Sequence, residues 1–328
     1  MITKKEIERG VSSQEIAEDD EIFSAIELNK EDIKPLTWIV KGIIPREGIL
    51  ILVAPPKAGK SLFILNIILD AVLGLNMLGT CDPCKIDKVL YIDLEDGKRR
   101  AKDRMGKILQ GEPYPENLHF ALVWPRIGNG GLEKLRDEIE KHGYRLIVID
   151  TFGKLQSPRK SANQYSYQHD IKDINELREI ATEYDIPIIL IHHTRKQGSN
   201  DWIDLVSGTH GIAGSADTLL FLERDRGSTD GTLYVSGRDV DEASYKIIFD
   251  KDTCSWTIAG LADGSELSKP RMEILNLLRS YDGTMSPKEI AEKLGKTDGS
   301  VKKQLANLVR NGDVLRPEHG QYTDRIRG

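Results

Sequence analysis

The middle of the chain alternates two kinds of hydrophobic pattern. Short, nearly continuous runs of Val, Ile and Leu are separated by longer segments in which apolar residues recur every three or four positions. The runs predict strands that are buried on both faces, and the longer segments predict amphipathic helices. Five strands are predicted here, at residues 48–53, 89–93, 119–123, 146–150 and 186–192. Four helices fit between them, at residues 60–75, 98–110, 131–142 and 171–184.

The pattern changes after these elements. Three further strands are predicted at residues 218–223, 232–236 and 245–249, with a fourth at 256–258. Their short spacing is typical of hairpins, so we expect them to extend the sheet in the antiparallel sense. The fold class predicted for this part is therefore α/β, with a mainly parallel sheet extended by antiparallel strands.

The last part of the chain has a pattern of its own. An amphipathic helix is predicted at residues 269–280, and Ser286 with Glu289 forms a capping box that starts another, closed by Gly295. A third helix and two short strands, 314–316 and 321–323, follow. This arrangement resembles a winged helix-turn-helix, whose second turn helix would present Lys302 and Lys303 to a DNA groove. Contact with a protein is the alternative.

These patterns divide the chain into three predicted parts. Residues 1–36 are a polar, acidic arm, either mobile or packed on a neighbouring subunit. Residues 37–262 form the α/β domain and residues 263–328 the small C-terminal domain. The C-terminal residues 266–328 carry 12 Lys and Arg against 9 Asp and Glu, a net +3, and the remainder carries 34 against 43, a net −9. A basic tail on an acidic body indicates an anionic partner, with a merely solvated surface as the alternative.

Composition excludes several classes of protein. With 39% apolar and 30% charged residues among 328, the chain can bury a core and is not biased towards disorder. No apolar run reaches the roughly 18 residues that a membrane span needs, so no membrane partner is expected. Three cysteines are too few for a disulfide framework. We therefore expect a cytoplasmic protein.

A phosphate-binding loop follows the first predicted strand. The segment Ala54-Pro55-Pro56-Lys57-Ala58-Gly59-Lys60-Ser61 has P-loop spacing, with alanine in place of the first glycine. Proline has no N–H, so the amide donors to a nucleotide must come from the residues after Pro56. The predicted donors and ligands are Lys57, Ala58, Gly59, Lys60, Ser61 and Leu62. Lys60 would sit on the β and γ phosphates of ATP, and Ser61 would ligate Mg²⁺.

Two other strands end in carboxylates. The strand at 146–150 delivers Asp150 to the sheet edge, where a Walker B acid supports Mg²⁺. The strand at 89–93 ends in Asp93, Glu95 and Asp96, one of which can orient an attacking water. Spacing alone does not choose among the three, and the longer reach of Glu95 favours it.

Together these segments resemble the RecA-like ATPases, and among them the RepA-type replicative helicases, often grouped with the AAA-family ATPases. The resemblance covers residues 38–258. It is carried by an ordered set of motifs: Thr37–Pro45, the P-loop, Tyr91–Asp96, Val148–Thr151, Ile191–Lys196, Gly214–Thr218 and Ser236–Val240. The RepA-type proteins end near the sheet, whereas this chain continues into the C-terminal domain. In this respect the chain departs from the family's pattern.

The resemblance implies roles for particular residues. The catalytic glutamate falls on Glu95 and the sensor of the γ phosphate on His193. Ring helicases also insert an arginine from the neighbouring subunit, which falls on Arg224, with Arg226 and Arg238 as competitors. The loops 153–169 and 195–214 would face a channel that holds single-stranded DNA, where Arg159, Lys160, Arg195 and Lys196 would track the phosphate backbone. Solvated surface loops are the alternative.

The sequence therefore predicts a Mg²⁺-dependent ATPase that acts on DNA as a ring-shaped homo-oligomer, most simply a hexamer. The resemblance implies a replicative DNA helicase of a plasmid, phage or mobile element. The alternative is an ATP-switched DNA-binding regulator or helicase loader that unwinds nothing.

Overall fold

The computed structural model describes residues 23–158, 166–193, 214–262, 274, 277–278, 281, 283–310, 314–318 and 320–324. Most of the helix predicted at 269–280 lies outside these residues. Also outside them are residues 159–165 of the first predicted channel loop and residues 195–213 of the second, and with these Arg159, Lys160, Arg195 and Lys196.

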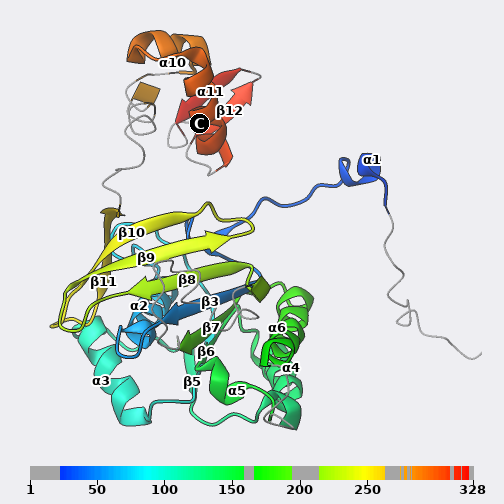
Figure 1. The fold of residues 1–328 in the computed structure, drawn as a ribbon, viewed down its shortest axis with the longest axis vertical. Coiled ribbons are helices and arrows are strands. Elements are labelled where there is room, and N and C mark those ends of the chain that lie inside the picture. The colour runs from blue at the N-terminus through cyan, green and yellow to red at the C-terminus, as the bar shows by residue number, and fades with distance from the viewer. Residues whose placement is uncertain are drawn as a thin grey trace, which may run out of the picture. The chain divides into compact units, whose positions relative to one another are not determined.

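A nine-stranded sheet forms the centre of the α/β part (Figure 1). Its order is β11-β10-β9-β8-β3-β7-β6-β4-β5. The six strands from β8 to β5 are parallel, and β9, β10 and β11 continue the sheet antiparallel. The strands are β3 (Ile49–Ala54), β4 (Val89–Asp93), β5 (Leu118–Ala121), β6 (Leu146–Asp150), β7 (Ile188–His193), β8 (Thr218–Glu223), β9 (Asp230–Gly237), β10 (Ala243–Phe249) and β11 (Trp256–Leu261). The predicted α/β class and the antiparallel extension are confirmed.

The parallel strands are apolar on both faces because helices cover both. Along β3, the side chains of Leu50 and Leu52 enter one core cluster, and those of Ile49, Ile51 and Val53 enter another. Helices α2 (Lys60–Leu73) and α3 (Lys98–Leu109) cover the first face. Helices α4 (Gly131–His142), α5 (Phe152–Leu155) and α6 (Ser166–Glu183) cover the second. This is the reason for the near-continuous Val/Ile/Leu runs.

The main differences from the predicted elements lie at ends and in short pieces. Helix α2 stops at Leu73 because Gly74 adopts a left-handed conformation that caps it. Helix α6 begins at Ser166, five residues before the predicted start. The small hairpin of β1 (Trp38–Val40) and β2 (Ile44–Pro45), the 3-10 turn η1 (Ile127–Asn129) and α5 were not predicted. Two to four residues are too few to show a periodic pattern.

The C-terminal part has its own apolar core. Helix α10 (Pro287–Leu294) starts at the predicted capping box of Ser286 and Glu289 and ends at Gly295. Helix α11 (Asp298–Arg310) and the hairpin of β12 (Val314–Glu318) with β13 (Gln321–Asp324) follow. The buried residues are Ile274, Leu278, Met285, Ile290, Ala291, Val301, Leu305, Leu308 and Val314. This is the winged helix arrangement that the sequence predicts.

The described end of the N-terminal arm contains one short helix. Helix α1 (Ala25–Leu28) is capped by Ser24 and Glu27, and none of its side chains is buried. Within the described residues, no helix combines the length and apolar character that crossing a membrane requires.

Candidate nucleotide site

The strand register gathers the predicted site residues at one edge of the sheet. Ala54, which ends β3, pairs with His193, which ends β7. On the next pair of strands, Asp93 lies opposite Asp150. Because the strands are parallel, their carboxyl ends meet, and this edge is where open α/β sheets bind ligands.

The P-loop follows β3 directly and leads into α2. Gly59, the N-cap of α2, has φ +104°, and a Cβ there would lie 2.9 Å from Cζ2 of Trp256. Only glycine fits both constraints. The first amides of α2 have no acceptor within the helix and face the loop, as phosphate binding requires. Among the predicted donors, the amide of Ala58 already donates to the carbonyl of Pro55 at 3.3 Å.

Lys60 is buried and held by three acceptors. Its Nζ donates to the carbonyl oxygens of Ala54 and Pro55, at 3.1 and 3.2 Å, and lies 2.9 Å from Nδ1 of His193. Burial lowers the pKa of Lys60 to about 8, against the opposing effect of Asp150 and Glu95. The ammonium is thus poorly solvated and surrounded by negative charge.

His193 connects Lys60 to Glu95. An ammonium group can only donate, so Nδ1 of His193 accepts and its ring proton sits on Nε2. Nε2 in turn donates to Oε1 of Glu95 at 3.1 Å. The lysine, the histidine and the glutamate, which are far apart in the sequence, therefore form one hydrogen-bonded chain at the sheet edge.

The structure separates the three acids after β4. Oδ1 of Asp93 accepts the amides of Glu95 and Asp96, at 3.2 and 2.8 Å, so Asp93 holds the turn. Asp96 is paired with two arginines, Arg100 and Arg104. Glu95 alone of the three contacts His193, and its side chain is 36% exposed.

Asp150 lies in a buried, oxygen-rich place that fits Mg²⁺. Burial raises its pKa, the hydroxyls of Ser61 and Tyr91 lower it by hydrogen bonding, and the charges of Asp93 and Glu95 raise it again. Hydroxyl and carboxylate oxygens are the ligands that Mg²⁺ prefers, and clustered carboxylates favour a cation. Ser61 and Asp150 are therefore suited to hold it.

Tyr91 is a site residue that sequence reasoning missed. Its hydroxyl donates to Oδ2 of Asp150 at 2.9 Å from the neighbouring strand β4. The signal in the sequence was a single hydroxyl within an apolar strand, Val89-Leu90-Tyr91-Ile92. A buried phenol needs a partner.

The remaining candidates lie in different surroundings. His192, the neighbour of His193 for which the sequence indicates a structural role, packs its ring on that of Phe152, with centroids 6.3 Å apart. Arg224 lies over two aromatic rings of its own chain. Arg226 is exposed. Arg238 pairs with Asp217 at 3.2 Å.

Comparison with protein families gives two matches. The family described as "AAA domain" matches residues 16–199, more than half of the chain. The family described as "Winged helix-turn-helix DNA-binding" matches residues 267–312.

Individual relatives are distant. The chain is 25% identical over 222 residues to "DNA repair protein RadA" of Helicobacter pylori J99, covering 67% of this chain and 42% of that protein. It is 25% identical over 189 residues to the protein of the same name in Streptococcus pneumoniae R6, covering 57% and 38%. The chain thus spans less than half the length of these relatives.

Among solved structures, one titled "Crystal structure of the RadB recombinase" is 14% identical, with a TM-score of 0.45, and the likeness covers 66% of this chain and 91% of that one. That likeness is too remote to bear on function. The sheet, the P-loop and the first family match agree, and the chain belongs to the AAA-domain family as a RecA-like protein with an added C-terminal winged helix.

Proposed function

We propose that this chain is a Mg²⁺-dependent ATPase that acts on DNA as a homo-oligomeric ring, a hexamer, and that it unwinds DNA as the replicative helicase of a plasmid, phage or mobile element. The observation that carries the ATPase proposal is the hydrogen-bonded chain of Lys60, His193 and Glu95 beside Ser61 and Asp150.

The P-loop residues do the binding in this proposal. The amides that open α2 and the ammonium of Lys60 hold the phosphates. Ser61 and Asp150 hold Mg²⁺, which when bound offsets the phosphate charge. Tyr91 keeps the carboxylate of Asp150 oriented.

Glu95 and His193 act on the reacting groups. Glu95 accepts a hydrogen bond from the attacking water and orients it. Lys60 cannot hold both the phosphate and Nδ1 of His193 with the same proton, so nucleotide binding competes with that contact. His193, no longer held by Lys60, then senses the γ phosphate. The loss of its contact with Lys60 changes the hydrogen bond between His193 and Glu95.

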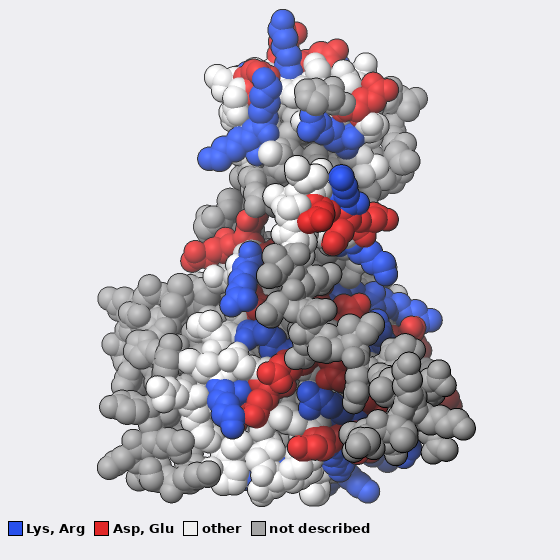
Figure 2. All heavy atoms as spheres, turned by 90° about the vertical axis from the view of Figure 1, so that its right-hand side faces the viewer, with Lys and Arg blue, Asp and Glu red and all other residues white. Residues whose placement is uncertain are grey.

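DNA binding is proposed for two places. The first is the winged helix, where Lys302 and Lys303 are exposed on α11. Figure 2 shows Lys and Arg side chains projecting from the C-terminal part at the top of the view. The second is the channel of the ring, for single-stranded DNA. The relatives named for DNA repair support DNA as the partner.

We also propose the domain limits 1–36, 37–262 and 263–328. The separate apolar core of residues 274–314 supports the second limit.

A forked duplex with a fluorescent strand tests the helicase proposal. We expect strand release that requires ATP and Mg²⁺, from protein whose mass by light scattering is several times 36.8 kDa. Tight binding to one duplex sequence, with hydrolysis but no release at any fork, would replace the helicase by the regulator or loader.

A further inference from the structure

Among the residues that the structure describes, Arg224 has no counter-charge. It follows β8 directly and is half-buried. Within the described residues, its buried Nε has no hydrogen-bond partner and no carboxylate acts on its charge. Burial lowers the pKa of Arg224. Desolvating an unpaired charge is costly, so such a group calls for an anion that is supplied from outside the chain.

The guanidinium of this arginine lies over two aromatic rings. The guanidinium carbon lies 4.4 Å from the ring centroid of Phe249 and 5.1 Å from that of Trp256. The two rings pack on each other, with centroids 4.8 Å apart. We call Phe249 and Trp256 the aromatic shelf. A guanidinium that lies over ring faces keeps the N–H donors of its terminal nitrogens for another partner.

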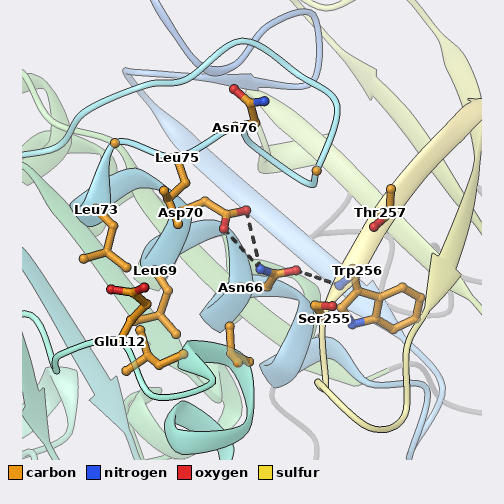
Figure 3. Close-up of a pocket in the computed structure, with 14 residues that line it drawn as sticks. Asn66, Leu69, Asp70, Leu73, Leu75, Asn76, Glu112, Ser255, Trp256 and Thr257 are labelled. Carbon is orange, nitrogen blue, oxygen red and sulfur yellow. Dashed lines mark hydrogen bonds between the residues drawn. The ribbon is translucent and has the colours of Figure 1, made fainter.

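The aromatic shelf is tied to the helix that follows the P-loop. The amide of Trp256 donates to Oδ1 of Asn66 on α2 at 2.7 Å (Figure 3). Both residues line a pocket of about 560 Å³. The edge of the indole also packs on Phe63, with centroids 5.9 Å apart. These contacts hold the shelf rigidly against α2.

The shelf places Arg224 beside the P-loop of its own chain. Strand β8 pairs with β3 in parallel, so both end at the nucleotide edge of the sheet. A Cβ on Gly59 would lie 2.9 Å from Trp256 and 3.6 Å from a terminal nitrogen of Arg224. The anion expected at Gly59 is a phosphate group.

We propose that Arg224 binds the phosphate chain of the nucleotide held by its own P-loop, with the aromatic shelf orienting it. This inference rests on the proposed nucleotide site and changes the role of one residue in it. The resemblance to ring helicases assigns Arg224 to the site of a neighbouring subunit. Arg238, by contrast, follows Gly237, which pairs with the first residue of β8 at the opposite edge of the sheet. It is therefore remote from its own P-loop.

Nucleotide affinity is the first test. Binding of a fluorescent ADP analogue is measured by anisotropy for the parent protein, Arg224→Ala, Arg224→Lys and Lys60→Ala. The matched control is Arg136→Ala, which removes an arginine from a surface pair with Glu183. We expect Arg224→Ala to weaken binding about 10- to 100-fold, as loss of a hydrogen bond to a charged group does. Arg224→Lys, which keeps the charge but not the planar stack, falls between.

Subunit mixing is the second test. Were Arg224 to act on a neighbour, Arg224→Ala and Lys60→Ala chains would together build intact sites, and the ATPase activity of the mixture would exceed the sum of the two. We expect no such gain. Exchange of subunits is verified by co-purification of differently tagged chains. A gain on mixing overturns the inference.

The outcomes separate this inference from the proposed function. If the parent protein binds no nucleotide, or Lys60→Ala binds it normally, the nucleotide site itself is wrong. If Lys60→Ala abolishes binding and Arg224→Ala binds like the parent, only the role of Arg224 is wrong. If Arg224→Ala lowers the melting temperature without nucleotide but leaves its affinity unchanged, the arginine merely packs on the shelf.

Discussion

Three carboxyl groups, those of Asp93, Glu95 and Asp96, lie within four residues, and their surroundings suit them to different roles. Asp93 accepts hydrogen bonds from two amides of the turn after β4, and Asp96 forms ion pairs with two arginines. Glu95 is left partly exposed and in contact with the histidine that also touches Lys60. Proton transfer requires a carboxylate that can reach solvent and substrate, and this condition is met by Glu95.

Replacing Glu95 by glutamine tests this assignment. Glu95→Gln keeps the size of the side chain but removes the charge that polarises water. We expect nearly parental affinity for Mg²⁺-ATP and a loss of about 10²–10⁴-fold in single-turnover hydrolysis. Asp150→Asn should instead impair Mg²⁺-dependent binding and hydrolysis together. Asp93→Asn and Asp96→Asn are the controls; near-parental hydrolysis by Glu95→Gln, with a loss in one control, assigns the acid to that control.

Lys60 predicts a pH dependence of nucleotide binding. Its pKa of about 8 lies below the ordinary value, so the free protein loses this positive charge as the pH rises through 8. Phosphate requires the charged form. Affinity for ADP should therefore be level from pH 6.5 to 7.5 and fall steadily above 8. Circular dichroism at each pH controls for unfolding, and affinity that stays constant to pH 9.5 would refute the low pKa.

The residue scale also shows where sequence reading stops. The positions of the P-loop, Asp150 and Glu95 at this edge of the sheet could be predicted, because each lies at the end of a strand or within a few residues after it, and their roles stay predictions. The contacts of Tyr91 and Arg224 could not be predicted. The partner of Tyr91 lies on β6, and the partners of Arg224 lie on β10 and β11, all distant in sequence. Their surroundings follow from sheet order, which local pattern does not contain.

At the scale of elements, α2 links the P-loop to the far strand β11. Its first residue is Lys60 and its middle carries Asn66, which anchors Trp256. One turn further, Asp70 is buried, and its Oδ2 accepts the amide of Leu78 at 3.0 Å. Burial raises the pKa of Asp70 to about 7. The helix thus contains a carboxyl that prefers its protonated form.

The raised pKa of Asp70 makes the free energy of unfolding decrease as the pH rises towards 7. Between about pH 4 and 7 the folded chain keeps a proton on Asp70 that the unfolded chain releases, so this group stabilises most below pH 4 and loses its effect as the pH rises to 7. The slope is at most about 1.4 kcal/mol per pH unit. Asp70→Asn removes the titrating group. The difference in unfolding free energy, parent minus Asp70→Asn, should fall from pH 5 to 7 and level off above 7; a constant difference would contradict the raised pKa.

Element prediction succeeded where a pattern was long. Strands β4, β6 and β8 and helix α4 fall on the predicted residues, because each is a full apolar run or a three-turn amphipathic segment bounded by Gly or charged residues. The β1–β2 hairpin and α5 were missed, because so few residues carry no period. Their positions depend on packing against the sheet.

At the scale of the whole molecule, the charge of the chain is divided between an acidic body and a basic tail. Both lysines of α11 are exposed, but Lys302 is paired with Asp298 at 2.6 Å, whereas no ion pair of Lys303 is found among the described residues. The two lysines should therefore contribute unequally to a phosphate backbone. The family match of residues 267–312 makes DNA the first partner to test.

Deleting residues 263–328 should weaken binding to duplex DNA and flatten its salt dependence. Each lost phosphate contact lowers the slope of log affinity against log salt by about 0.9. Lys303→Ala should remove about one such unit and Lys302→Ala less. Anisotropy titrations with a labelled duplex from 50 to roughly 200 mM salt give the slopes. A slope that survives the deletion would indicate that the C-terminal part binds protein instead.

The proposed function requires that the residues at this edge of the sheet hydrolyse ATP and that this hydrolysis is coupled to action on DNA. The most direct measurement is the rate of phosphate release from ATP by the whole chain, with and without Mg²⁺ and with and without single-stranded DNA, beside Lys60→Ala. We predict hydrolysis that requires Mg²⁺, rises several-fold with DNA and disappears in Lys60→Ala. Hydrolysis that persists in Lys60→Ala, or none in the parent protein under any of these conditions, would contradict the account.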